Sequence, residues 1–113
     1  MTSRRLVLAL DLVADAALIA AYRARHAPGA VWADIVRDIR DRGILDMEIW
    51  QVEDRLVMIV DVAADYPRPA DPALQETVAR WEAEMDGYQR PIRDDGPKWL
   101  PMERIFALAD QPG

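Results

Sequence analysis

The segment "AYRARHAPGAVWADI", residues 21–35, holds the only histidine of the chain. Tyr22 precedes His26 by four residues, so in a helix the phenol and the imidazole share one face. An imidazole exchanges a proton near neutral pH without a large pKa shift, and a nearby phenol can orient it or a bound hydroxyl. The pair indicates acid–base chemistry. The alternative is a histidine stabilised by the helix dipole, with Tyr22 as ordinary core.

Other side chains with chemical potential are scattered. Flat aromatic faces suit a sugar ring or a planar cofactor, although a tryptophan more commonly packs in a core. The four tryptophans are Trp32, Trp50, Trp81 and Trp99. The carboxylates considered are Asp46, Glu48, Asp61, Glu82 and Glu103. One histidine with scattered carboxylates lacks the spacing of a metal site, so no metal is predicted. The sequence also shows no glycine-rich phosphate loop, nucleophile elbow or Walker pattern.

Composition restricts the partners. The length of 113 residues predicts one domain over residues 1–113. A formal net charge of −6 argues against nucleic acid and an anionic membrane surface as partners. The absence of cysteine is compatible with a reducing cytoplasm, which is the expected location. The apolar N-terminal run is interrupted by Asp11 and Asp15, so it is interpreted as a strand and not as a signal peptide.

Hydrophobic periodicity predicts the elements. Strands are expected at residues 4–13, 44–52, 55–63 and within 102–109, and helices from Asp15 to about 26, over about 30–42, and over 72–88. This order is the ferredoxin-like βαββαβ arrangement of an α+β protein. Strands 4–13 and 55–63 are apolar on both faces, whereas helices can cover only one face. The second face is expected to meet the same face of another chain, giving a homodimeric α/β barrel.

Five segments in order carry a family resemblance. They are Y-x-x-x-H-x-P-G-A-V-W, "DMEIW" shortly after Gly43, "RLVMIVDV", "ARWEAEMDGYQRP" and W-x-P-M-E-R-I-F-A-L. Together they resemble the L-rhamnose mutarotase family over roughly residues 4–108, and more closely its L-fucose mutarotase-like branch. The resemblance implies a small dimeric α/β-barrel isomerase. Such a protein interconverts the α and β anomers of a 6-deoxy-hexopyranose without a cofactor.

The same resemblance implies roles for individual residues. The catalytic histidine of the family falls on His26, and its substrate-contacting tyrosine falls on Tyr22. A tryptophan pair that lines the sugar matches at Trp81, but its second position is Glu82. Rhamnose-type members place a tyrosine on the second strand where this chain has Met47. Both departures lie at expected sugar contacts, so they favour L-fucose or a related sugar over rhamnose.

Mutarotation requires a proton to leave the anomeric hydroxyl and another to reach the ring oxygen. We expect His26 to deliver the proton to the ring oxygen, Tyr22 to hold a hydroxyl or relay a proton, and Trp81 to stack on the sugar. Glu82 or Glu103 could bind hydroxyls or complete the proton transfer. Two other functions stay open: a haem-handling monooxygenase of the same architecture, and a non-catalytic sugar-binding module.

Overall fold

A computed structural model describes residues 4–113 of the chain. Its strands are β1 (Arg4–Leu12), β2 (Ile44–Val52), β3 (Arg55–Val62), β4 (Gln89–Arg90) and β5 (Leu100–Pro101). Its α-helices are α1 (Ala16–Arg25), α2 (Ala33–Asp41) and α3 (Gln75–Asp86), with short 3₁₀ helices at Pro72–Leu74 and Leu108–Asp110. All strand pairs are antiparallel, the main order is β2-β3-β1-β4, and β5 also pairs with β1. This is the strand order of the predicted ferredoxin-like fold.

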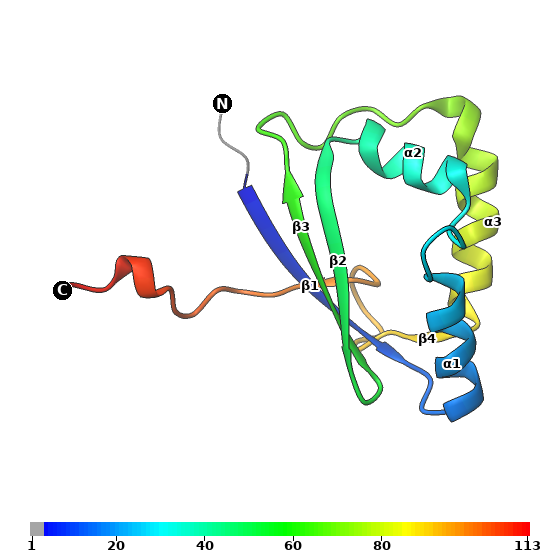
Figure 1. Ribbon diagram of the computed structural model, residues 1–113, viewed down its shortest axis with the longest axis horizontal. Coiled ribbons are helices and arrows are strands. Elements are labelled where there is room, and N and C mark those ends of the chain that lie inside the picture. The colour runs from blue at the N-terminus through cyan, green and yellow to red at the C-terminus, as the bar shows by residue number, and fades with distance from the viewer. Residues whose placement is uncertain (1–3) are drawn as a thin grey trace.

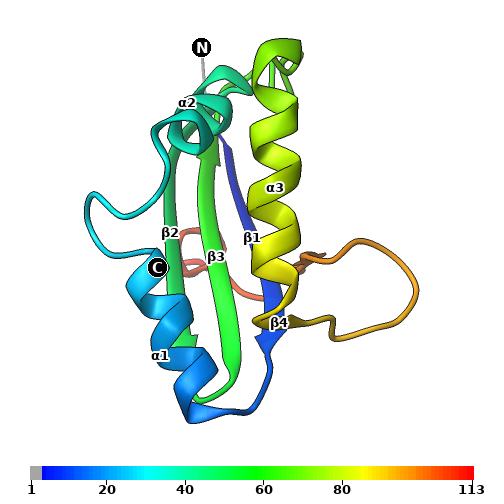
Figure 2. The same cartoon turned by 90° about the vertical axis from the view of Figure 1, so that its right-hand side faces the viewer.

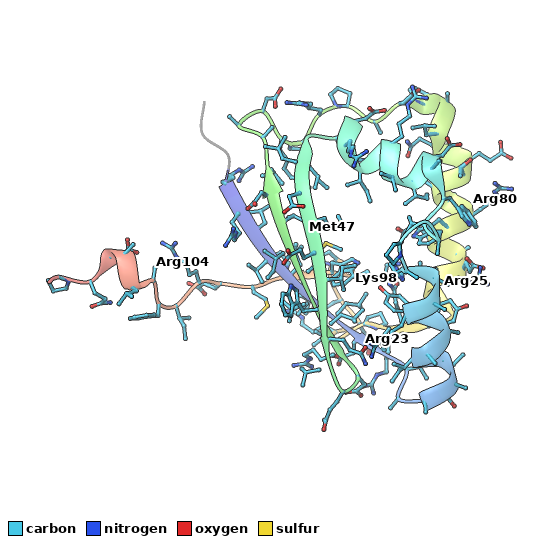
Figure 3. The ribbon with its side chains drawn as sticks, viewed as in Figure 1. Arg23, Arg25, Met47, Arg80, Lys98 and Arg104 are labelled. Carbon is cyan, nitrogen blue, oxygen red and sulfur yellow. The ribbon has the colours of Figure 1, made fainter. Side chains whose placement is uncertain are left out.

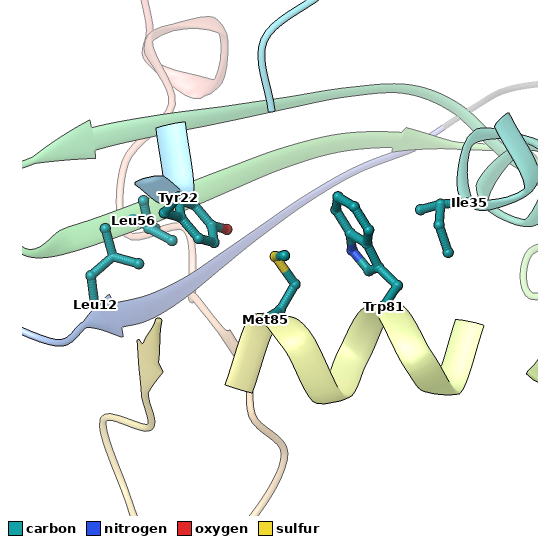
Figure 4. Packing of buried hydrophobic residues seen from close by; sticks show 6 residues of the cluster. All are labelled: Leu12, Tyr22, Ile35, Leu56, Trp81 and Met85. Atoms are coloured by element: carbon teal, nitrogen blue, oxygen red, sulfur yellow. The ribbon is translucent and has the colours of Figure 1, made fainter. Parts of the chain in front are cut away.

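All three α-helices lie on the same side of the sheet, as Figures 1 and 2 show. The strand register decides which side chains face them. Leu10 on β1 lies opposite Leu56 on β3, and both are almost completely buried. The core between sheet and helices contains the six residues drawn in Figure 4: Leu12, Tyr22, Ile35, Leu56, Trp81 and Met85. The core therefore belongs to one face of the sheet.

The helix that carries Tyr22 begins where the sequence predicts. The Asp15 carboxylate accepts a hydrogen bond from the Leu18 amide at 2.9 Å, which satisfies one of the free donors of the first turn. The helix ends at His26, its C-terminal cap. The next helix starts three residues later than expected, at Ala33, because a turn occupies the residues around Pro28 and Gly29.

The predicted final strand within residues 102–109 is wrong. After Leu100–Pro101 the Met102 amide still donates to the Val7 carbonyl at 2.7 Å, but the following residues pair with no strand of the described chain. Figure 1 shows this segment leaving on the side of the sheet opposite the helices. Ile105 is 94% exposed and Phe106 is 61% exposed. The apolar pattern suits a strand, but the pairing with β1 ends at the Met102 amide, and the chain then leaves the sheet.

Among residues 4–113, no helix has the length and apolar character needed to cross a membrane.

Candidate active site

A cavity of about 570 Å³ opens between β2, β3 and the three helices. Its wall contains all five side chains that the sequence analysis assigned to the site: Tyr22, His26, Met47, Trp81 and Glu82. They come from α1, β2 and α3, and Figure 3 labels Met47 on β2. Of the five carboxylates considered, Asp46 also lines this cavity, whereas Glu103 is exposed in the C-terminal segment and does not. Folding therefore favours Glu82 over Glu103 as the site carboxylate.

The end of α1 fixes the orientation of His26. The ring Nδ1 lies 2.8 Å from the backbone carbonyl oxygen of Tyr22, one turn earlier in the helix. A carbonyl oxygen can only accept a hydrogen bond, so Nδ1 must carry a hydrogen and donate it. The neutral ring is therefore held in the Nδ1–H tautomer. Nε2 is left as the nitrogen that can exchange a proton at the cavity.

Tyr22 lies against this imidazole and is buried. The ring centroids of Tyr22 and His26 are 4.3 Å apart, and Tyr22 is only 4% exposed. Burial raises the pKa of the Tyr22 phenol, while a hydrogen bond from Gln89 and the charge of Lys98 act in the opposite direction. The phenol therefore stays protonated through the neutral range, where its hydroxyl can donate a hydrogen bond.

Aromatic side chains form one wall of the cavity. Trp81 on α3 is 6% exposed, with its ring edge-on to His26 at 5.7 Å and to Trp32 at 5.1 Å. Figure 4 shows Tyr22 and Trp81 on either side of Met85. Trp99 also lines the cavity, whereas Trp50 is 63% exposed on β2. Trp81 and Trp99 thus line the cavity, Trp32 packs against Trp81, and Trp50 lies at the surface.

The Glu82 carboxylate at the cavity is held by a lysine. Lys98 Nζ donates to Glu82 Oε2 at 2.7 Å and to Asp86 Oδ1 at 2.9 Å. Partial burial acts to lower the pKa of Lys98, but the hydrogen bonds to the two carboxylates outweigh it and raise that pKa. The cation connects the loop before Trp99 to α3. It therefore fixes both the Glu82 side chain and the position of the loop.

A second cavity, of about 490 Å³, adjoins the first. Tyr22, His26 and Ile49 line both cavities, and the second one extends along Gln51 and Glu53 of the hairpin. The imidazole and phenol consequently lie between two spaces. In residues 4–113 no group of three or more His, Cys, Asp or Glu side chains could hold a metal ion.

Two polar residues of the site were not singled out from the sequence. Gln89 lines the main cavity and contacts Tyr22, and Lys98 holds Glu82. Neither residue belongs to a recognisable catalytic spacing. For Gln89 the available signal was its place in the segment "ARWEAEMDGYQRP", whose residues carried the resemblance.

The fold and the cavity define a class of protein: a ferredoxin-like α+β domain whose cavity joins an imidazole of fixed tautomer, a phenol and an aromatic wall. Residues 5–108 match the L-rhamnose mutarotase family, and the chain belongs to that family. An L-fucose mutarotase of Xanthomonas campestris pv. campestris is 40% identical, over 97% of this chain and 92% of that protein.

A solved structure confirms the fold. The crystal structure of an L-rhamnose mutarotase from Formosa agariphila has a TM-score of 0.69 at 23% identity, covering 94% of this chain and 99% of that one. The predicted family and fold class are therefore confirmed. Family membership identifies a sugar mutarotase, an isomerase that acts on carbohydrates. The comparisons do not favour the haem-handling or the non-catalytic alternative.

Proposed function

We propose that the chain interconverts the anomers of a 6-deoxy-hexopyranose, with L-fucose preferred to L-rhamnose, at the cavity between α1, β2 and α3. The observation that carries this proposal is the 2.8 Å contact between His26 Nδ1 and the Tyr22 carbonyl, which leaves Nε2 for proton exchange. The preference for L-fucose is supported by the similarity to an L-fucose mutarotase and by the side chains at Met47 and Glu82.

The chemistry follows from the roles of the two α1 side chains. Ring opening breaks the bond between the anomeric carbon and the ring oxygen, while a proton leaves the anomeric hydroxyl and another reaches the ring oxygen. His26 acts in its imidazolium form: Nε2–H delivers the latter proton, while Nδ1–H stays bonded to the Tyr22 carbonyl. The Glu82 carboxylate takes up the proton that leaves the anomeric hydroxyl. The Tyr22 hydroxyl holds a sugar hydroxyl or relays a proton. Rotation about the C1–C2 bond of the open aldehyde and reclosure by the reverse steps give the other anomer.

The remaining wall positions the sugar. The Trp81 ring offers an apolar face to the C–H groups of a pyranose, and Glu82 accepts hydrogen bonds from its hydroxyls. Met47 contributes an apolar contact from β2, at the position where the family resemblance implies a tyrosine in rhamnose-type members. No cofactor is required by these steps.

The test is anomer exchange by saturation-transfer proton NMR on L-fucose and L-rhamnose, with wild type and His26→Ala. We expect exchange faster on L-fucose than on L-rhamnose, and lost in His26→Ala. Sugar binding without accelerated exchange would overturn the catalytic proposal. A higher rate on L-rhamnose would overturn the preference and leave the mechanism intact.

We further propose that the chain forms one domain and works in the cytoplasm. We also propose that the protein is a homodimer. Support comes from the sheet face opposite the helices, where Val57 and Ile59 are half-buried and Trp50 is 63% exposed. The C-terminal segment, which carries the exposed Ile105 and Phe106, leaves the sheet on this side (Figure 1). A second copy placed on this face covers both. We expect a dimer by sedimentation at micromolar concentration and weakened association for Ile105→Asp, whereas a wild-type monomer would contradict the homodimer.

A further inference from the structure

Gln89 is a buried polar residue for which the steps above have no role. It is 9% exposed and lies on β4, where it pairs with the fully buried Leu12 of β1. Its Nε2 donates to the Tyr22 hydroxyl oxygen at 3.5 Å. Its Oε1 is enclosed and has no hydrogen-bond partner among the described residues. The backbone around it is fixed, since the Val13 amide donates to the Tyr88 carbonyl at 2.9 Å.

An unpaired buried carbonyl is unfavourable, and an apolar side chain of similar size would avoid it. The sequence nevertheless places an amide at this position, with its donor group directed at the Tyr22 hydroxyl. A hydroxyl oxygen that accepts a hydrogen bond from one side must direct its own hydrogen elsewhere. The opposite arrangement, in which the phenol donates to its neighbour, would leave the sugar without a donor from Tyr22.

We propose that Gln89 is a positioning residue that donates to the Tyr22 hydroxyl oxygen and thereby turns the phenol hydrogen toward the sugar in the cavity. This inference rests on the proposed function. The amide is proposed to act through Tyr22, because one N–H of its Nε2 is directed at the phenol oxygen and its Oε1 is enclosed. The main cavity, which both residues line, is the space left for the phenol hydrogen.

The first test is a double-mutant cycle on the exchange rate with Gln89→Met and Tyr22→Phe. Methionine keeps the length of the side chain but removes the donor. We expect Gln89→Met to slow exchange about tenfold, the effect of losing one hydrogen bond, and to have no further effect in the Tyr22→Phe background. An equal loss in both backgrounds would overturn the proposal, because it would mean that Gln89 acts on packing and not through Tyr22.

The second test does not use a sugar. Tyrosine labelled with ¹³C at Cζ reports the titration of the Tyr22 phenol, assigned by its absence in Tyr22→Phe. Because a hydrogen bond from Gln89 stabilises the phenolate, we expect Gln89→Met to raise the pKa of Tyr22. An unchanged titration would overturn the contact.

Gln75→Met is the matched control, since Gln75 is a half-buried glutamine bonded to Asp38 Oδ1 at 3.1 Å. It does not line the main cavity and is expected to leave the Tyr22 titration and the exchange rate unchanged.

Gln89→Glu covers the case in which Gln89→Met does not fold. A carboxylate only accepts hydrogen bonds, so the phenol hydrogen turns toward it and away from the cavity. We expect slower exchange and a raised Tyr22 pKa, and wild-type values for both would overturn the proposal. Absent exchange in the wild type would instead overturn the proposed function, while the titration would still decide the contact between Gln89 and Tyr22.

Discussion

The two faces of the sheet are built from the same strands but meet different surroundings. On the helix side, Leu10 and Leu56 are almost fully buried, and the cavity lies above them. On the other side, Val57 and Ile59 are only half-buried, and Trp50 is largely exposed. One chain thus completes the face that carries the site but not the opposite face. Chemistry and association should therefore respond to different substitutions.

The largest expected contrast is between two tryptophans. Trp81→Ala removes a side chain that is 6% exposed and should lower the free energy of unfolding by about 3–5 kcal/mol. Trp50→Ala removes one that is 63% exposed and should change the stability of the single chain by less than about 0.5 kcal/mol. Urea unfolding at low protein concentration measures both, and similar losses for the two variants would contradict the contrast.

The next effect separates catalysis from stability on the helix side. In His26→Asn the side-chain amide nitrogen can still donate to the Tyr22 carbonyl, but the variant has no Nε2. We expect exchange to fall at least about 100-fold, the typical contribution of one acid–base group. Thermal unfolding should be unchanged. Near-wild-type exchange in a folded variant would contradict the role of His26.

On the sheet face opposite the helices, the stability contributed by Asp11 should depend on pH in the acid range. Asp11 accepts hydrogen bonds from Arg55 Nε at 2.7 Å and from Arg55 Nη2 at 3.1 Å, which hold the pKa of this carboxyl below its usual value. The stabilisation is present above the unfolded pKa of about 4 and is lost as pH falls through the folded value. Asp11→Asn should lower the free energy of unfolding by about 1–2 kcal/mol at neutral pH. In denaturant titrations it should also reduce the loss of stability as the pH falls below about 4. An unchanged loss of stability at low pH would exclude Asp11 as its source.

On the helix side, the stability contributed by Tyr22 should depend on pH in the alkaline range, and this effect is the smallest. Burial raises the folded pKa of Tyr22, so the folded state keeps its proton over a range where the unfolded chain loses it. Stability should then fall as pH rises from about 10 through the folded value. Tyr22→Phe should show a shallower decline in urea midpoint across this range. An equally steep decline would assign it to other groups, such as Lys98, whose pKa is also raised.

Much of this arrangement could be predicted from the sequence because it depends on local patterns. Alternating apolar residues located β1, β2 and β3, and Asp15 located the start of α1. The four-residue spacing of Tyr22 and His26 placed both on one helix face. The family resemblance supplied Met47, Trp81 and Glu82, which come from distant parts of the chain and meet only after folding.

The parts that could not be predicted depend on contacts between distant segments. The segment 102–109 has the composition of a strand, but composition does not reveal whether the chain stays beside β1. β4 is only two residues long, Gln89–Arg90, and gives no periodic signal. The contact of Gln89 with Tyr22 and that of Lys98 with Glu82 span 67 and 16 residues, so no local motif records them.

The hydrogen bond between His26 and the Tyr22 carbonyl selects the Nδ1–H tautomer of the imidazole, and this bond exists only while the last turn of α1 is formed. Helix ends open locally at a free-energy cost well below that of global unfolding. Each time this turn frays, the imidazole loses its carbonyl acceptor, and both neutral tautomers become accessible. The fraction of competent molecules should therefore follow the amide hydrogen exchange of residues 23–26. On heating, catalytic activity should decline before the sheet unfolds.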